Sequence, residues 1–243
     1  MRIAVISDIH GNLPALESVM KDISKRGVDT LVCLGDLIGK GPNSEEVIDI
    51  CRNECDIIVK GNWDDEIYKA YLDVKNGIPD VPERILWFVN SASPQHMEYL
   101  GSLPHSAELR LGEKLVRFFH AHPKNFNRYF QNSPVENRLE LFDSSDSDTE
   151  MLADVAVYGD IHNAYLQILQ GRYLINAGSV GSPLDINQSS YVILEADGET
   201  FDVRFMRIKY DIERAVALAV RYNVPDLDGQ ISELRTAKYF PRG

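Results

Sequence analysis

The chain has 243 residues, of which 44% are hydrophobic and 26% charged, an ordinary composition for a globular protein that buries a sizeable core. Its net charge of −12 argues against a protein that binds a nucleic-acid backbone, because such binding needs clustered lysines and arginines. The apolar runs are too short to span a membrane, and the N-terminus lacks the pattern of a secretory signal. The 3 cysteines argue against a disulfide framework. We therefore expect a cytoplasmic protein without a stable nucleic-acid or membrane partner.

The N-terminal part alternates compact Ile- and Val-rich runs with amphipathic stretches, which is typical of parallel βαβ units. We predict strands at residues 2–7, 30–34 and 56–59, and helices at 14–26 and 44–52. Residues 64–104 then change character, because apolar side chains recur at helical spacing and prolines punctuate them. This segment predicts a helical insertion.

The remainder of the chain is rich in short strands joined by turn signals. Gly112-Glu113, Gln170-Gly171 and Asp197-Gly198 indicate hairpins, and residues 144–148 predict an exposed acidic loop. The predicted strands are 108–111, 114–119, 155–158, 165–169, 173–175, 191–195 and 200–208, and the last clear helix is 212–222. Without a long linker or an internal repeat, this order fits a single α/β domain over residues 1–243, with two mixed sheets sandwiched between helices.

Polar side chains of a particular kind follow several of these strands. Because the ends of parallel strands meet at one edge of an α/β sheet, these side chains should gather in one place. They are three carboxylates, three imidazoles and one amide: Asp8, His10, Asp36, Asn62, His120, Asp160 and His162. Taken singly, each is more often a turn or capping residue, but taken together they predict a metal site.

Oxygen and nitrogen ligands in this mixture suit divalent ions of intermediate hardness. The set exceeds what one four-coordinate zinc ion needs, so we expect two ions with Asp36 between them. We favour manganese or iron, with zinc, nickel and magnesium as alternatives. Two ions about 3.5–4 Å apart are the arrangement used for phosphoester hydrolysis. They would also supply the local positive charge with which so acidic a protein binds phosphate.

The order of these motifs resembles that of the calcineurin-like metallophosphoesterase superfamily. The matching motifs are Asp8-Ile9-His10, Gly35-Asp36, Gly61-Asn62, His120 and Gly159-Asp160-Ile161-His162, and residues 35–42 and 176–181 resemble its small prokaryotic phosphodiesterase branch. The resemblance implies a four-layer α/β/β/α sandwich. It also implies that Asp8, His10 and His162 hold one ion, that Asn62, His120 and Asp160 hold the other, and that Asp36 bridges the two.

Two positions depart from the family pattern. Asp160 stands where the family usually has histidine, and a carboxylate there favours manganese, iron(II) or magnesium over zinc. Trp63 stands where many relatives have a histidine that protonates the leaving group, and an indole cannot transfer a proton at neutral pH. Either the leaving group needs little help or another acid serves. Our catalytic candidates are therefore the ligand Asn62 and His122, which is as readily interpreted as an exposed loop histidine.

Two further residues are candidates for substrate binding. Asn12 either contacts a substrate phosphate or caps the helix that follows it, and the cap is favoured; Trp63 either stacks on a base or packs in the core. The leading hypothesis is a phosphodiesterase that hydrolyses a small nucleotide-like substrate with a two-metal activated water, beside the insertion at 64–104. The alternatives are a diadenosine-polyphosphate hydrolase or protein phosphatase, and a non-catalytic metal- or nucleotide-binding regulatory protein. The sequence leaves the oligomeric state open.

Overall fold

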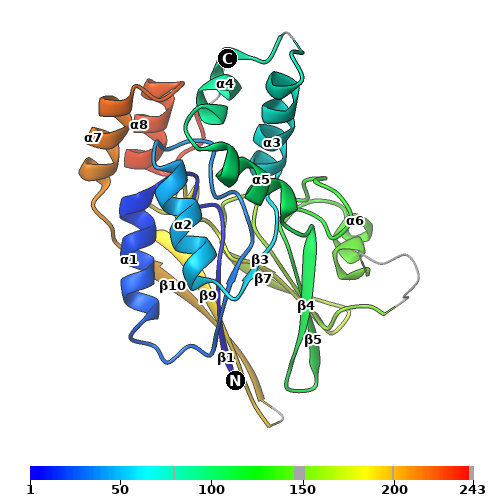
Figure 1. The fold of residues 1–243 in the computed structure, drawn as a ribbon. Helices are drawn as coiled ribbons and strands as arrows, with labels where there is room; N and C mark the ends of the chain where they lie inside the picture. Colours follow the sequence, from blue (N-terminus) through cyan, green and yellow to red (C-terminus); the bar gives the residue numbers. More distant parts are fainter. Residues whose placement is uncertain (79, 145–150, 199, 241–243) are drawn as a thin grey trace.

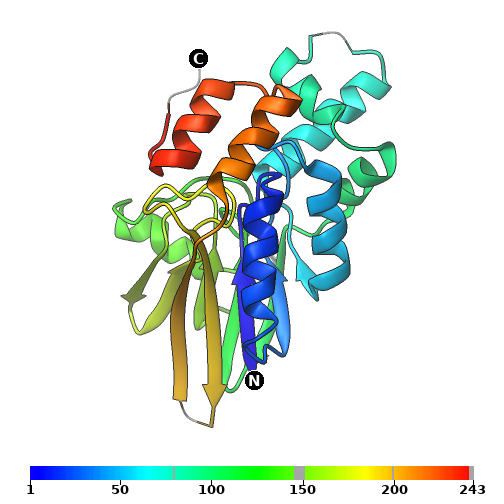
Figure 2. The same ribbon diagram turned by 90° about the vertical axis from the view of Figure 1, so that its left-hand side faces the viewer.

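Two five-stranded β-sheets lie face to face at the centre of the computed structural model, which describes residues 1–78, 80–144, 151–198 and 200–240. The strand order is β10-β9-β1-β2-β3 in the first sheet and β4-β5-β6-β8-β7 in the second. Helices cover the outer faces of both sheets (Figure 1, Figure 2). This arrangement confirms the predicted α/β sandwich with two mixed sheets.

The first sheet is organised around β1, which pairs parallel with β2 and antiparallel with β9. Alternate side chains of β1 enter different apolar clusters, because Ala4 and Ile6 face helices α1 and α2 while Ile3 and Val5 face the second sheet. Burial on both faces explains why the strand is a continuous apolar run. The elements are β1 (Arg2–Ile6), α1 (Leu13–Ile23), β2 (Thr30–Cys33), α2 (Ser44–Glu54), β3 (Ile57–Ile58), β9 (Ser189–Asp197) and β10 (Thr200–Ile208).

The second sheet has a parallel centre and antiparallel edges, because β6 pairs parallel with β5 and β8, whereas β4 and β7 run opposite to their neighbours. Phe118 and Val157 face the first sheet, and Phe119 and Tyr158 pack beneath η1 on the outer side. Of the predicted acidic loop, residues 145–148 lie outside the described residues. The elements are β4 (Ser106–Leu111), β5 (Lys114–Phe119), α6 (Val135–Leu139), η1 (Glu140–Phe142), β6 (Val155–Tyr158), β7 (Tyr165–Leu169) and β8 (Arg172–Asn176).

Three helices occupy the segment that was predicted to be a helical insertion (Figure 1). They are α3 (Asn62–Lys75), α4 (Glu83–Val89) and α5 (Pro94–Ser102). Ile67, Phe88 and Met97 belong to the same buried cluster as the apolar faces of α1 and α2, so the segment shares the main core. In the described part of the chain, none of the helices combines the length and the apolar character needed to cross a membrane.

A further helix, α8 (Leu227–Thr236), packs beside α7 (Ile212–Tyr222) and was not predicted. The expectation that the clear helices end at residue 222 was therefore wrong. The helical spacing of apolar residues does not predict α8, because the side chains that this helix buries include the polar Gln230 and Glu233. Glu233 tolerates burial because Lys40 Nζ lies 3.1 Å from its carboxylate.

The ends of β1 and β6 approach each other closely because Gly159 has no side chain. A Cβ at this position would lie 2.0 Å from Ser7 Oγ and 2.6 Å from Asp8 Oδ2. The adjacent amide of Asp160 donates to Asp8 Oδ2 at 3.1 Å, which joins the end of one sheet to the end of the other. Gly159 thus allows the end of β6 to approach the end of β1 closely.

We expect Gly159→Ala to lower the free energy of unfolding by about 2–3 kcal/mol, because the new methyl group forces Ser7 and Asp8 apart. Gly171→Ala is the matched control, since a Cβ there meets nothing within 4 Å and only its positive φ of 80° opposes alanine. That conformation costs about 1 kcal/mol. Urea unfolding of both variants measures the difference. Equal losses would show that close approach at Gly159 does not constrain the fold.

Candidate metal centre

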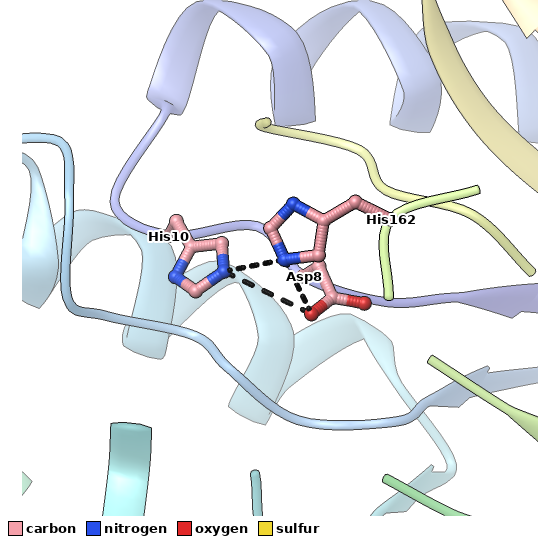
Figure 3. Close-up of side chains that lie close together, drawn as sticks. All are labelled: Asp8, His10 and His162. Carbon is pink, nitrogen blue, oxygen red and sulfur yellow. Dashed lines mark hydrogen bonds and ion pairs between the residues drawn. The ribbon is translucent and has the colours of Figure 1, made fainter. Parts of the chain in front are cut away.

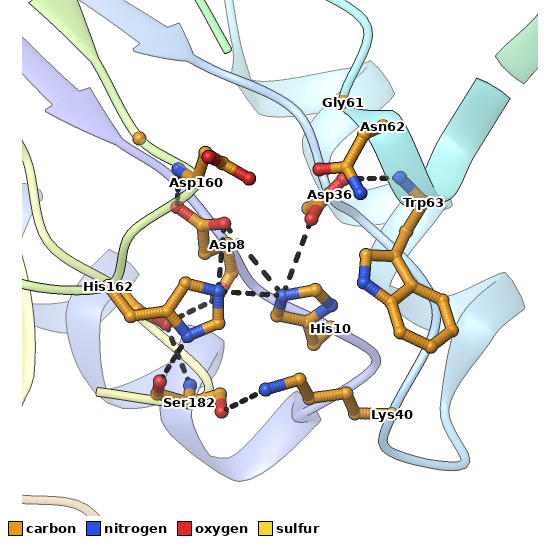
Figure 4. A network of polar contacts seen from close by, with 12 residues as sticks. Asp8, His10, Asp36, Lys40, Gly61, Asn62, Trp63, Asp160, His162 and Ser182 are labelled. Atoms are coloured by element: carbon orange, nitrogen blue, oxygen red, sulfur yellow. Dashed lines mark hydrogen bonds and ion pairs between the residues drawn. The ribbon is translucent and has the colours of Figure 1, made fainter. Parts of the chain in front are cut away.

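The structure brings the predicted ligands together where strands of the two sheets end, and Figure 4 shows all of them except His120. Each lies just beyond a strand: Asp8 and His10 after β1, Asp36 after β2, Asn62 after β3, His120 after β5, and Asp160 and His162 after β6. All except Asn62 are buried. Residues far apart in the sequence therefore form one polar cluster within the apolar sandwich.

Most of these side chains project from a left-handed backbone, which residues other than glycine rarely adopt. The φ angles are 55° for Asp8, 51° for His10, 52° for Asp36, 64° for Asp160 and 58° for His162. Each such residue costs roughly 1–3 kcal/mol unless its surroundings hold it in place. Here the amides of Asp8 and His10 donate to the carbonyls of Gly35 and Asp36 at 3.0 and 2.9 Å. The strain is thus located at the candidate site and is held by hydrogen bonds between neighbouring strand ends.

Each of the three imidazoles is oriented through its Nδ1 atom. Nδ1 of His10 lies 3.1 Å from the carbonyl of Ile38, and Nδ1 of His120 lies 2.8 Å from that of Leu34. Nδ1 of His162 contacts the carbonyl of Ser182. A carbonyl can only accept, so Nδ1 carries the proton in each ring, and a neutral imidazole then presents the lone pair of Nε2. This is the usual orientation of histidines that bind metals.

The Nε2 atoms of His10 and His162 face each other across 3.2 Å, beside the carboxylate of Asp8 (Figure 3). Asp8 Oδ1 lies 3.2 Å from His162 Nε2 and 3.8 Å from His10 Nε2, and among the described residues it has no hydrogen-bond partner. Neutral rings oriented in this way place lone pairs against lone pairs, which is unfavourable without a cation. Ligand atoms bound to a metal at about 2.0–2.2 Å are separated by comparable distances. These residues therefore fit a divalent ion.

A second group shares Asp8 with the first. Asp36 Oδ2 lies 3.5 Å from His10 Nε2 and 3.3 Å from His120 Nε2, so one oxygen lies between two imidazoles. Asp8, Asp36 and His120 together satisfy the spacing of a metal site, and Asn62 Oδ1 lies 3.0 Å from His120 Nε2. Burial opposes a charge on His120, yet the charges of Asp36 and Asp8 raise its pKa well above its ordinary value. Without a metal, this shift favours the cationic form of His120, with a second proton on Nε2 that must leave before Nε2 can bind a metal.

Asp64 lies behind Asp36 and ties this part of the site to α3. Its fully buried carboxylate accepts the amides of Gly61, Asp36 and Leu37 at 2.9, 2.8 and 2.9 Å. Burial and the nearby charge of Asp36 raise the pKa of Asp64 to about 7. Asp64 therefore positions the backbone that presents Asp36 and does not itself reach the ligand cluster.

Asp160 lies beside the cluster, but its carboxylate is engaged in another way. Arg128 Nε donates to Oδ2 at 2.7 Å and Nη2 donates to Oδ1 at 2.6 Å, a two-pronged ion pair. Asp160 Oδ1 is 3.9 Å from His120 Nε2, and neither candidate metal group includes Asp160. The assignment of Asp160 as a ligand remains a prediction, now with a guanidinium beside it.

The other predicted site residues have different surroundings. Asn12 uses both ends of its amide structurally, accepting from Ala15 N at 3.2 Å and donating to the carbonyl of Gly181 at 2.8 Å. This geometry corresponds to the helix-capping alternative. His122 is buried against Tyr129, its Nδ1 accepts from Lys124 N at 3.1 Å, and it is not among the described residues that line the cavity beside the cluster. Burial also lowers its pKa, which makes it a poor proton donor at neutral pH.

A cavity of about 560 Å³ adjoins the cluster and brings in residues that the sequence analysis did not single out. Trp63 lines it, with the guanidinium of Arg84 5.6 Å from its ring centroid. Lys40, Arg128 and Tyr239 line it as well. Motif spacing does not identify Arg84, Arg128 or Tyr239, which lie on α4, in the stretch before α6 and in the C-terminal segment. Trp63 was a predicted substrate-binding residue, and Lys40 lies within the family-like residues 35–42. The cavity thus combines the candidate ligands with an aromatic ring and several cationic groups.

Comparison with known proteins agrees with this geometry. The family model for the calcineurin-like phosphoesterase superfamily domain matches residues 1–199. The uncharacterized protein MJ0912 of Methanocaldococcus jannaschii is 34% identical over 245 residues, covering 94% of this chain and 96% of the relative. The phosphodiesterase YfcE of Escherichia coli is 27% identical over 209 residues, covering 81% of this chain and 89% of the relative.

A solved structure is similar over nearly the whole chain. The metallophosphoesterase from Sphaerobacter thermophilus has a TM-score of 0.74 and 26% sequence identity, with 98% of this chain and 99% of that chain covered. The family match, the related sequences and the similar fold all extend over the strands that carry the candidate ligands. The chain therefore belongs to the calcineurin-like phosphoesterase superfamily, in its small prokaryotic metallophosphoesterase branch.

Proposed function

We propose that this protein is a metal-dependent phosphodiesterase that hydrolyses a small nucleotide-like phosphodiester. The observation that carries the proposal is the facing pair of Nε2 atoms on His10 and His162 beside the unpartnered Oδ1 of Asp8. One ion would be held there, and a second by Asn62, His120 and the shared carboxylate of Asp36. Bound divalent ions would lower the pKa of a coordinated water and polarise a phosphoryl oxygen.

The residues of the chain then have separate tasks. Asp8 and Asp36 provide negative charge between the imidazoles, and Asp64 fixes the backbone of Asp36 through its three amide contacts. Lys40 and Arg84 line the cavity, each beside a carboxylate, and their N–H groups can donate to an anionic ester. Because no histidine occupies position 63, we propose a substrate whose leaving group departs with little protonation.

The cavity supports a small substrate. Its volume of about 560 Å³ lies within the range typical of sites for small molecules. The indole of Trp63 offers an aromatic surface beside cationic groups, which suits a nucleobase or another aromatic group attached to phosphate. The relative YfcE is named as a phosphodiesterase, which favours diesters. We propose manganese or iron as the native metals, since the ligand set mixes carboxylate and amide oxygens with imidazole nitrogens and contains no thiolate.

We expect the manganese-loaded protein to hydrolyse bis-p-nitrophenyl phosphate, and Asp36→Asn to lower the rate on the order of 100-fold or more. The reason is that Asp36 contributes to both ion positions, and even indirect contacts to a metal typically account for 10- to 100-fold, roughly. Asp49→Asn is the control, because Asp49 is an exposed aspartate on α2 paired with His96. Release of p-nitrophenolate gives the rates.

A substrate panel tests the class of ester. Diesters, monoesters, dinucleoside polyphosphates and phosphopeptides would be compared with manganese, iron, nickel and zinc supplied in turn. The proposal expects diesters to give the highest kcat/KM. Preference for dinucleoside polyphosphates or phosphopeptides would replace the diester assignment, and absence of turnover with every metal would reject an enzymatic role.

We also expect metal binding at pH 7 to release about one proton per protein, because His120 is protonated without metal and must lose that proton to bind. Its raised pKa fixes the sign: metal affinity increases with pH until the pH exceeds that pKa. Isothermal titration calorimetry in two buffers with different ionisation enthalpies measures the release. His120→Asn removes the titrating group and should abolish it, whereas equal enthalpies in both buffers for the native protein would contradict the prediction.

A further inference from the structure

Arg128 reaches the candidate metal centre from residues 123–134, a stretch without helix or strand between β5 and α6. Its side chain is about half exposed, at 49%, whereas the carboxylate that it contacts on Asp160 is only 3% exposed. The guanidinium therefore bridges a buried carboxylate and the open cavity, which Arg128 also lines. Such an arrangement leaves one side of the guanidinium accessible to a ligand.

The surroundings of Arg128 hold its segment in place. Tyr158 Oη, on β6, donates to the carbonyl of Tyr129 at 3.0 Å, and Tyr129 Oη donates to Glu140 at 2.9 Å. Phe130 N donates to Ser133 Oγ at 2.9 Å. These contacts hold the residues that directly follow Arg128: the first attaches them to the second sheet, the second to η1, and the third closes a turn within the stretch. The guanidinium is therefore presented from an anchored segment.

The pairing with Asp160 uses only part of what the guanidinium can donate. An arginine has five N–H groups, and the two contacts to Asp160 use the one on Nε and one on Nη2. Nη1 and the remaining hydrogen of Nη2 make no other hydrogen bond with the described residues. A planar group with adjacent free donors matches the oxygens of a phosphate.

The charge balance at position 160 also favours a phosphate contact by Arg128 over a metal bound to Asp160. The ion pair of Asp160 and Arg128 has no net charge, like the neutral imidazole that the resemblance leads one to expect there. The pair differs from an imidazole because its positive end faces the cavity. A metal ion bound to Asp160 would have to approach a carboxylate whose two oxygens already accept charge-assisted hydrogen bonds from a cation.

We propose that Arg128 is a substrate-binding residue that donates to a non-bridging phosphoryl oxygen at the metal centre, and that Asp160 is the positioning residue that orients it. Asp160 is then a partner of Arg128 and not a metal ligand. The proposal rests on the proposed phosphoesterase function, because it assigns to this site an anionic phosphoryl group.

The test compares Arg128→Ala, Arg128→Lys and Asp160→Asn with the native protein, all loaded with manganese. Inorganic phosphate is the probe, its binding measured by calorimetry and by competitive inhibition, and elemental analysis gives the metal content. We expect the arginine variants to weaken phosphate binding by about 10- to 100-fold, the range for a charge-assisted hydrogen bond, and to raise KM. Lysine should not rescue binding fully, because it lacks the planar pair of donors.

Asp160→Asn distinguishes a positioning residue from a ligand. We expect it to keep the native metal content and to weaken phosphate binding nearly as much as Arg128→Ala does. The double variant Arg128→Ala/Asp160→Asn should bind phosphate no worse than Arg128→Ala, because the two residues act as one unit. Arg110→Ala is the control for lost charge, since Arg110 is exposed near the β4–β5 turn, at the other end of the second sheet.

Separate outcomes overturn the inference and the proposed function. Loss of metal in Asp160→Asn, or unchanged phosphate binding in Arg128→Ala, overturns the inference whether or not the native protein is active. Native protein that hydrolyses no ester but loses phosphate affinity in Arg128→Ala refutes the proposed activity and leaves the phosphate contact standing. If Asp160→Asn does not fold, Arg128→Ala and Arg128→Lys still test whether Arg128 contacts phosphate. The side chain of Arg128 is about half exposed, so it can be changed without opening the core.

Discussion

The two imidazole nitrogens of His10 and His162, held 3.2 Å apart beside a buried carboxylate, impose the constraint on which much of this structure depends. Buried lone pairs and negative charge that face each other need a cation, and the fold does not relieve them by turning the rings away. Backbone carbonyls fix the opposite side of each ring. Both sheets must therefore end at the same place, and Gly159 allows the strand ends to come close enough.

The same constraint accounts for the unusual backbone of the site. Asp8-Ile9-His10 follows β1 of the first sheet, and Asp160-Ile161-His162 follows β6 of the second; in both turns the aspartate and the histidine have φ between 51° and 64°. In each turn, a left-handed aspartate and a left-handed histidine flank one residue of ordinary conformation. The two turns differ in their partners, because the first aspartate faces imidazoles whereas the second faces a guanidinium. The same backbone turn thus presents one aspartate to imidazoles and the other to a guanidinium.

The sequence was informative where a local pattern determines structure. Ile- and Val-rich runs identify the buried strands because both of their faces are covered, and the polar residues just beyond them are found by the same reasoning. The cavity wall was not predictable in this way. Arg128 is separated from Asp160 by 32 residues and belongs to a stretch without periodicity, so nothing in the sequence shows that the two meet. Helix α8 was missed for a related reason, since it buries a glutamate whose partners include a lysine distant in the sequence.

Lys40 links the candidate centre to a part of the chain beyond the shared family domain. It lines the cavity, and its ammonium contacts Ser182 Oγ at 2.8 Å and Glu233 of α8 at 3.1 Å; Tyr239, which follows α8, lines the cavity too. The family match ends at residue 199, so Glu233 and Tyr239 lie beyond it, whereas the described residues that line the cavity, apart from Tyr239, lie within it. The C-terminal segment therefore completes a cavity that the ligand-bearing part of the chain mostly forms. Exchange of the C-terminal segment between relatives would change which molecules fit the cavity while the strands that carry the ligands stayed intact, a route by which one scaffold diversifies.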